Sequence, residues 1–343
     1  MAPAVRSMCA VSERRLSTLA SSQKYLKGLS YARFGYRFAA PFMIIFLIFN
    51  MYPTLYTIFI SFTDMQGVGN ETHFLEEPFA NFASMFQNKT FLDSLKNTVL
   101  IWIMNFIPQM SLALLLTAWF TSRTSKLKCQ GFFKVVFYMP NIITAATIAI
   151  LFNTLFGYPR GPVNELLMNM GILDKSFDYF TSKGASQTIV AFIQFWTWFG
   201  NTMIMMISGV LGISPDIFEA ADIDGANSVQ TFFSITLPNL KTILLYTLIT
   251  SMIGGLNMFD IPLLFNNGGP DNATTTASVF IYQLAFKGRQ VFGKAAAASM
   301  MLFVIIGILS AILFWLMRDK EAIAAEKLKK EMRKKWKKES RGV

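Results

Sequence analysis

Amides, aromatic rings and one carboxylate stand within or beside long stretches of this chain that otherwise carry almost no charge. Polar groups in such apolar segments are costly, so they usually face a partner helix or a cavity. Aromatic faces with a few convergent amides and carboxylates are also a common means of holding a sugar. The strongest candidates for a solute path are Gln194, Trp196, Trp198 and Asn201 in one stretch, and Asn257, Phe259 and Asp260 in another.

Each of these residues also has a plainer interpretation. An amide can form a hydrogen bond across a helix interface, and an aromatic ring can lie in the belt at the lipid headgroups. Asp260 differs from the rest, because a carboxylate near the end of an apolar stretch can pair with a Lys or Arg of a partner instead of touching solute. Weaker candidates in neighbouring stretches are Asn105, Gln109, Asn141 and Asn153.

The residues expected at a catalytic centre are missing from the sequence. There is no G-x-x-x-x-G-K-S/T segment to cradle a nucleotide phosphate, and the single histidine, His73, excludes a histidine-based catalytic array. We therefore expect no catalytic residue, no metal site and no cofactor, and we predict that the protein is not an enzyme. The two cysteines, Cys9 and Cys129, are expected to be free thiols.

The elements that carry the candidates are predicted to be membrane-spanning helices. The chain is 53% hydrophobic and only 15% charged, whereas about 25% is usual for a soluble domain. The chain contains uncharged runs that are long enough for helices that cross the hydrocarbon core, and it lacks the short alternating segments of a β-barrel. The six predicted spans are 38–63, 97–122, 135–159, 184–215, 242–259 and 295–317.

The fold class is therefore all-α, a polytopic membrane protein with about six transmembrane helices. We expect a cytoplasmic segment over 1–37, a transmembrane domain over 38–317 and a basic cytoplasmic tail over 318–343. Proline kinks or ends helices, and transporter spans tolerate it where neighbouring groups satisfy the backbone. Such sites are predicted at Pro53, Pro108, Pro140 and Pro262.

Basic residues predict the orientation of the chain. Most of the 31 Lys and Arg fall in the N-terminal segment, in the loop after the second span and in the tail. Since basic loops stay in the cytoplasm, both termini are predicted to be cytoplasmic. The basic tail directly follows a span and the chain has no nucleic-acid-binding motif, so we expect the tail to lie against anionic lipid rather than nucleic acid.

A loop of different character lies between the fourth and fifth spans, over 212–240. Ser214 is a suitable N-cap for a short helix, with Pro215 at its first position and Asp216 in its first turn. Gly225 suits the left-handed end of that helix. Asn227 or Ser228 then caps a second short helix, which Pro238 ends or bends. The two helices are expected to form a cytosolic protrusion that a partner can grip.

The sequence of this loop resembles the EAA motif of ABC-importer permeases, which reads EAA, three residues, G, nine residues, I-x-L-P. The matching residues are Glu219, Ala220, Ala221, Asp224, Gly225, Ile235, Leu237 and Pro238. The resemblance implies that this loop is the coupling helix that sits in a groove of the ATPase subunit. It also implies that Glu219 pairs with an arginine there.

Two other stretches resemble the sugar branch of that family, typified by the maltose and glycerol-phosphate permeases. They are Phe265 to Pro270, similar to the family's T-x-G-G-P segment with Asn in place of Thr, and Trp196-x-x-x-Gly200. The resemblance implies a complex with a second permease subunit, an ABC ATPase dimer and an extracytoplasmic solute-binding protein. It also implies a sugar substrate and a location in the cytoplasmic membrane.

Three alternatives compete with the sugar importer. An ABC permease for another solute, such as glycerol phosphate, would share the same loop. An ion-coupled secondary transporter would need intramembrane charges, of which Asp260 is the single candidate, and would leave the EAA-like loop unexplained. A membrane enzyme would need clustered catalytic carboxylates, whereas the acidic residues here fit the coupling loop better.

Overall fold

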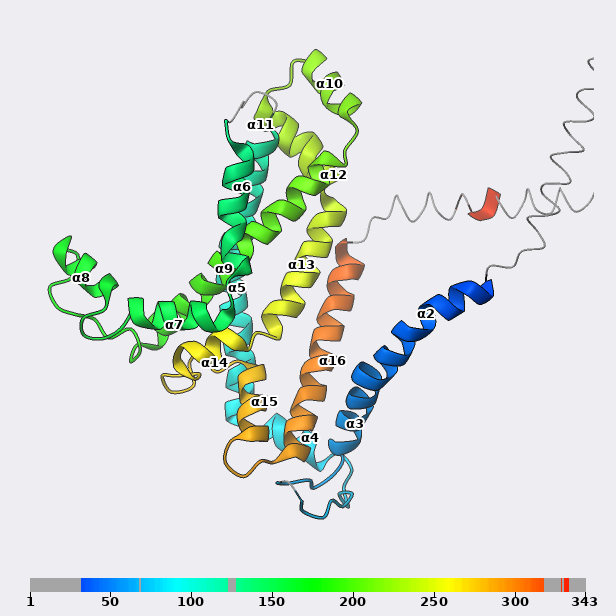
Figure 1. Ribbon diagram of the computed structural model, residues 1–343, viewed down its shortest axis with the longest axis vertical. Coiled ribbons are helices and arrows are strands. Elements are labelled where there is room, and N and C mark those ends of the chain that lie inside the picture. Colours follow the sequence, from blue (N-terminus) through cyan, green and yellow to red (C-terminus); the bar gives the residue numbers. More distant parts are fainter. Residues whose placement is uncertain (1–31, 68, 123–127, 318–327, 329, 333–343) are drawn as a thin grey trace, which may run out of the picture. The chain divides into compact units, whose positions relative to one another are not determined.

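The computed structural model describes residues 32–67, 69–122, 128–317, 328 and 330–332, and its regular structure there is helical (Figure 1). The first elements are α2 (Ala32–Phe46), η1 (Leu47–Met51), α3 (Tyr52–Ile60), α4 (Ala80–Gln87), α5 (Lys89–Thr121), α6 (Gln130–Tyr138), η2 (Met139–Ile142), α7 (Ala145–Leu155) and α8 (Pro162–Asn169). The remainder are α9 (Lys183–Leu211), α10 (Pro215–Ile223), α11 (Ser228–Thr231), η3 (Phe232–Thr236), α12 (Leu237–Asn239), α13 (Lys241–Leu256), α14 (Asp260–Asn266), α15 (Ala277–Phe286) and α16 (Phe292–Met317).

Five helical runs in the described residues are long and apolar enough to cross a membrane, and a bent pair makes a sixth if it counts as one span. The five runs are Phe34–Ile60, Lys89–Thr121, Lys183–Leu211, Lys241–Asn266 and Phe292–Met317. The all-α fold with about six spans is thus confirmed. The basic tail lies almost wholly outside the described residues, as do Cys9 and most of the segment 1–37.

The third predicted span, 135–159, is strongly bent. The run Gln130–Ile142 meets α7 at an angle of 92°. Pro140 lies in the 3₁₀ turn η2, where its missing N–H ends the regular helix, and the Thr144 hydroxyl then caps α7 by accepting a hydrogen bond from the Thr147 N–H. Pro108, in contrast, lies inside the continuous helix α5, so it does not end that helix.

The centre of the bundle is the contact between α5 and α9. Ala113, Leu116, Phe120, Phe199 and Met203 form a buried cluster along it. Close approach of α6 to α9 depends on Gly200, since a Cβ there would collide with the backbone carbonyl oxygen of Phe137. This packing fixes the relative positions of the polar residues that α5 and α9 carry.

The stretch between the fifth and sixth predicted spans includes the short apolar helix α15. With ten residues it is shorter than a spanning helix, and the Thr276 side chain caps it. The turn before α15 is tied to the bundle, because the Asn97 Nδ2 donates to the Asn272 carbonyl oxygen (2.8 Å) and the Gln187 Nε2 donates to the Ala273 carbonyl oxygen (2.8 Å).

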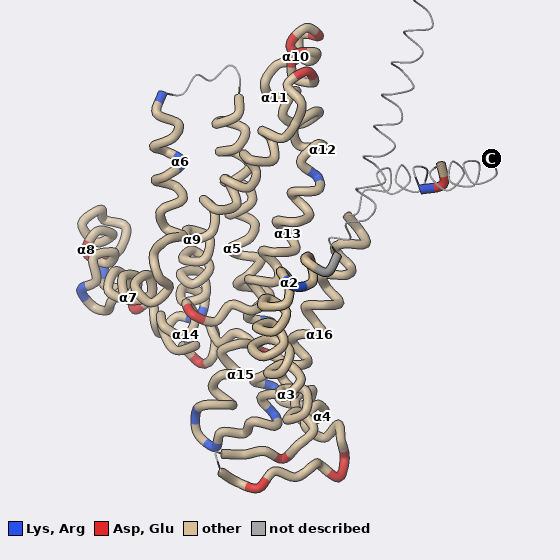
Figure 2. Tube along the Cα trace, turned by 45° about the vertical axis from the view of Figure 1, so that its right-hand side comes forward, with Lys and Arg blue, Asp and Glu red and all other residues tan. Residues whose placement is uncertain are grey.

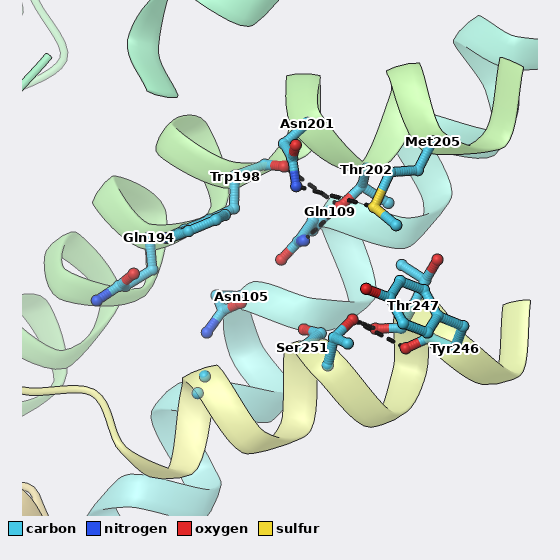
Figure 3. Close-up of a pocket in the computed structure, with 13 residues that line it drawn as sticks. Asn105, Gln109, Gln194, Trp198, Asn201, Thr202, Met205, Tyr246, Thr247 and Ser251 are labelled. Carbon is cyan, nitrogen blue, oxygen red and sulfur yellow. Dashed lines mark hydrogen bonds between the residues drawn. The ribbon is translucent and has the colours of Figure 1, made fainter. Parts of the chain in front are cut away.

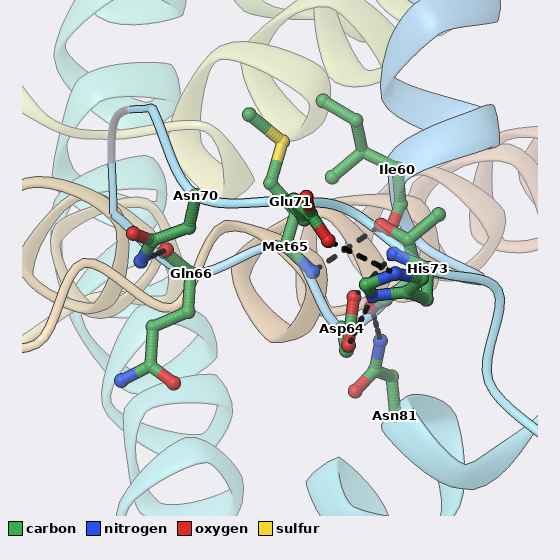
Figure 4. A network of polar contacts seen from close by, with 9 residues as sticks. Ile60, Asp64, Met65, Gln66, Asn70, Glu71, His73 and Asn81 are labelled. Atoms are coloured by element: carbon green, nitrogen blue, oxygen red, sulfur yellow. Dashed lines mark hydrogen bonds and ion pairs between the residues drawn. The ribbon is translucent and has the colours of Figure 1, made fainter.

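The loop after α3 is also anchored, as Figure 4 shows. The buried Asn81 amide donates to the Thr63 carbonyl oxygen (2.9 Å), and Gly293 N–H donates to the Met65 carbonyl oxygen (3.0 Å). His73 lies 3.7 Å from carboxylate oxygens of both Asp64 and Glu71, at an exposed position. Residues up to Phe59 form a separate unit whose helices α2, η1 and α3 expose most of their large apolar side chains.

Candidate functional site

A polar pocket of about 220 Å³ lies among α5, α9 and α13 (Figure 3). Each helix contributes side chains at a spacing of three or four residues, which puts them on one helix face. The polar and aromatic residues that line the pocket are Asn105 and Gln109 from α5, Gln194, Trp198, Asn201 and Thr202 from α9, and Tyr246, Thr247, Thr250 and Ser251 from α13. None of the residues lining it carries a formal charge.

The pocket wall is held by one hydrogen bond between α5 and α9 and by others within each helix. The Gln109 Nε2 donates to the Thr202 hydroxyl (2.7 Å), and that hydroxyl in turn donates to the Trp198 carbonyl oxygen (3.2 Å). Asn105 donates to the Ile101 carbonyl oxygen within its own helix (3.2 Å). Both α5 amides are about 95% buried, so their orientation is fixed before any solute arrives.

A second pocket, of about 310 Å³, continues from the first toward the end of α13. The two pockets share Gln194, Trp198 and Gly254. The wall of the second pocket also includes Asn141 from η2, Thr197 from α9, Asn257 and Phe259 between α13 and α14, and Asp260 at the start of α14. The shared residues make one continuous polar surface along α13, with Trp198 at the junction.

Six of the seven predicted path residues line one or both of these pockets. The exception is Trp196, which packs in the core against Phe152, with ring centroids 5.7 Å apart, and lines neither pocket. Trp198 is two residues further along α9, and 47% of it is exposed. The weaker candidate Asn153 lies at a different, more open pocket beside Tyr158 and Asp178.

Sequence reasoning missed the α13 side of the first pocket. Tyr246, Thr250 and Gly254 follow one another at intervals of four residues along an otherwise apolar helix, and lead to the predicted Asn257 directly after it. That interval places these residues on one face of α13, so the sequence did contain a pattern that indicates a partly polar helix face. Thr and Tyr are common enough in spans that the pattern is not informative until α5 and α9 are placed opposite it.

The loop over 212–240 forms the expected protrusion, at the opposite end of the bundle from α15 (Figures 1 and 2). Helix α10 ends in a Schellman arrangement, in which Ala226 N–H donates to the Ala221 carbonyl oxygen (3.0 Å) and Gly225 N–H donates to that of Asp222 (3.2 Å). Gly225 has φ +73°, as predicted. Glu219 is exposed, whereas Ala221 is buried.

One detail of this loop differs from expectation, and another resolves the choice between Asn227 and Ser228. Ser214 makes no capping hydrogen bond to α10; its hydroxyl instead donates to the Asp216 carboxylate (3.3 Å). Asn227, rather than Ser228, caps α11, forming a reciprocal capping box with Gln230. Pro215 begins α10, as predicted.

Pro238 does not end the second helix. A π-helical turn, η3, precedes it, where Leu237 N–H donates to the carbonyl oxygen of Phe232, five residues back. The wider turn accommodates the proline, which supplies no N–H and whose ring would collide with a carbonyl in a regular helix. The chain then continues through α12 directly into α13, so the protrusion is joined to the helix that lines the polar pockets.

The protrusion also rests on the ends of the central helices. A pocket of about 220 Å³ lies between it and the bundle, lined by Ala118 and Thr121 of α5, Val210 of α9, and Phe218 and Asp222 of α10 among others. In the described part of the chain, the loop over 212–240 therefore shares a pocket with the ends of α5 and α9, the two helices that also line the first polar pocket.

A family model described as the binding-protein-dependent transport system inner membrane component matches residues 78–319. The chain belongs to this family, and is therefore a membrane-embedded permease subunit of an ABC importer rather than an enzyme.

Relatives with assigned names agree with the family. The chain is 30% identical over 289 residues to the lactose transport system permease protein LacF of Rhizobium radiobacter, covering 84% of this chain and 95% of LacF. It is 28% identical over 297 residues to the arabinooligosaccharides transport system permease protein AraP of Bacillus subtilis (strain 168), covering 85% and 92% of the two chains. The crystal structure of a bacterial ABC transporter involved in the import of the acidic polysaccharide alginate has a chain of the same fold, with a TM-score of 0.71, 22% identity, and coverage of 86% and 98%.

Proposed function

We propose that this permease forms half of the translocation path for an oligosaccharide, and that the two joined pockets are the part of the path that this chain contributes. The first lies between α5, α9 and α13, and the second between η2, α7, α9 and the junction of α13 with α14. The observation that carries the proposal is the junction at Trp198, where an exposed ring lies between a first wall of neutral hydrogen-bonding groups and a second wall whose one charged residue is Asp260. Sugars combine flat apolar ring faces with many hydroxyls, so they fit such a surface. The names of the relatives LacF and AraP support a carbohydrate.

We infer that the remaining wall comes from a second permease subunit. Tyr246, Thr250 and Asn257 are exposed although they line the pockets. Exposed polar side chains in a membrane-spanning helix are costly against lipid, and a facing permease would cover them. The family's dependence on a binding protein supports delivery of the solute from outside by an extracytoplasmic partner.

The loop around Glu219 is proposed to couple this path to an ABC ATPase dimer. Its exposed carboxylate is available to a partner, and the helical continuity from α11 to α13 provides a mechanical route from the loop to the pocket wall. Closure of the ATPase would then shift α13 relative to α9 and change access to the pockets. In this proposal the loop and both termini are cytoplasmic.

Purification of the tagged chain from its own host in gentle detergent tests the assembly. We expect an ABC ATPase, a second permease and a solute-binding protein to co-purify, and the captured binding protein to bind an oligosaccharide by calorimetry. A preparation that contains the ATPase and whose binding protein takes glycerol phosphate but no sugar would overturn the substrate class while leaving the importer intact.

A further inference from the structure

The charge along the proposed path is uneven, and a single carboxylate accounts for it. The residues lining the first pocket include no charged side chain, and those lining the second include one, Asp260. Both pockets lack Lys, Arg and His among their lining residues. A solute that passes along these two pockets therefore meets one negative charge and no positive charge from their walls.

The Asp260 carboxylate is not engaged elsewhere in the described part of the chain. It is exposed, and within that part no hydrogen bond or ion pair to its side chain is found. Two basic residues in neighbouring segments have other partners: Lys183 lies 3.4 Å from the Asp271 carboxylate, and the Lys287 ammonium donates to the Asn267 side-chain oxygen (2.7 Å). Neither lysine lines either pocket.

We propose that Asp260 is a charge filter in the second pocket, which favours neutral or amino-bearing sugars and disfavours anionic ones such as uronates and sugar phosphates. This inference rests on the proposed function, because the filter matters only if the pockets carry solute. In a pocket partly shielded from water, one unit charge within several ångströms changes the local concentration of a monovalent ion by roughly tenfold. The fold itself does not decide the solute's charge, since a chain of this fold serves an importer of the acidic polysaccharide alginate.

Charged thiol reagents measure this field without knowledge of the natural solute. In the assembled complex, with Cys9 and Cys129 replaced by Ser, Asn257→Cys places a thiol in the wall beside Asp260. Its rates of reaction with cationic, anionic and neutral methanethiosulfonates are compared with and without Asp260→Asn. A matched thiol introduced by Thr250→Cys lies in the first pocket, roughly 10 Å further along α13.

We expect the cationic reagent to be favoured over the anionic one in the Asn257→Cys variant. Asp260→Asn should lower that preference on the order of tenfold, with a smaller change in the Thr250→Cys variant. An unchanged preference after Asp260→Asn would mean that a cation of the partner permease neutralises the carboxylate, and would overturn the filter. Failure of the neutral reagent to reach either introduced thiol would instead overturn the proposed path itself. The two failures are therefore distinguishable.

Discussion

Two tryptophans two residues apart have different surroundings, and the difference decides which one is expected to touch solute. Trp198 lies at the junction of the two pockets, whereas Trp196 packs against Phe152 in the core. From the sequence, both tryptophans were candidates for the solute path because of their residue type and their position in an apolar stretch. The direction in which each ring points depends on the helix rotation that α5 and α7 impose, which the sequence of α9 alone does not specify.

Replacing Trp198 is predicted to weaken solute handling without disturbing the fold. Trp198→Ala removes the aromatic face at the junction, so the half-saturation concentration for uptake should rise by roughly tenfold, while Trp198→Phe should retain most of the wild-type value. Trp196→Ala should instead lower the yield of folded protein, because it leaves a cavity in the core. Uptake kinetics and size-exclusion yield separate the two effects; normal uptake by Trp198→Ala would contradict the assigned path.

Glu219 is predicted to act through its charge. Glu219→Lys should abolish uptake while the protein still inserts. The substitution replaces the exposed carboxylate by an ammonium group, which repels the arginine of the ATPase that is proposed to pair with Glu219. Asp216→Asn, a change on the same helix, is the control and should retain uptake. If Glu219→Lys transports normally and the ATPase remains bound, the coupling assignment fails.

At the scale of elements, local chemistry predicted most of the backbone structure of the loop over 212–240. Three features of this loop depend only on neighbours within a few residues, so the sequence specifies them. They are the start of α10 at Pro215, its left-handed end at Gly225 and the N-cap of α11 at Asn227. The continuation of the helix past Pro238 was harder to predict from the sequence, because a π-helical turn lets the helix continue where a proline normally ends it.

The end of α10 offers a test of backbone conformation alone. Gly225 has φ +73°, and no neighbouring atom lies within 4 Å of the position that a Cβ would take, so a side chain there meets strain rather than a collision. Gly225→Val should cost about 1–2 kcal/mol of local stability and disable uptake, while Gly225→Asn, which tolerates this conformation, should retain activity. Uptake assays compare the two variants, and equal loss in both would show that glycine is needed for contact with a partner instead.

Helix packing gives a second prediction at this scale. Gly200→Ala should sharply reduce the folded yield, because its Cβ meets the Phe137 carbonyl and neither backbone can move away freely. Gly307→Ala in α16 has open space and should be neutral or slightly stabilising. Thermal unfolding in detergent compares the two, and a stable Gly200→Ala protein would contradict the close packing of α6 on α9.

At the scale of the whole molecule, hydropathy predicted the class and the approximate number of spans. Hydropathy alone did not predict the 92° bend between Gln130–Ile142 and α7 or the helix α15, although the kink or stop predicted at Pro140 lies at that bend. The two joined pockets likewise arise from helices that are distant in sequence, which are α5, α9 and α13 in the first pocket and η2, α7, α9 and the α13–α14 junction in the second. Sequence therefore supplied most of the polar residues but not the shape of the site.

The central claim is that transport through this chain is driven by an ATPase acting on the Glu219 loop. Its most direct test is uptake of the binding protein's oligosaccharide into proteoliposomes that contain the purified complex. We expect uptake to require ATP and the binding protein, and to be lost in Glu219→Lys although the complex remains assembled. Uptake that an ion gradient drives without ATP, and that Glu219→Lys leaves intact, would contradict this claim.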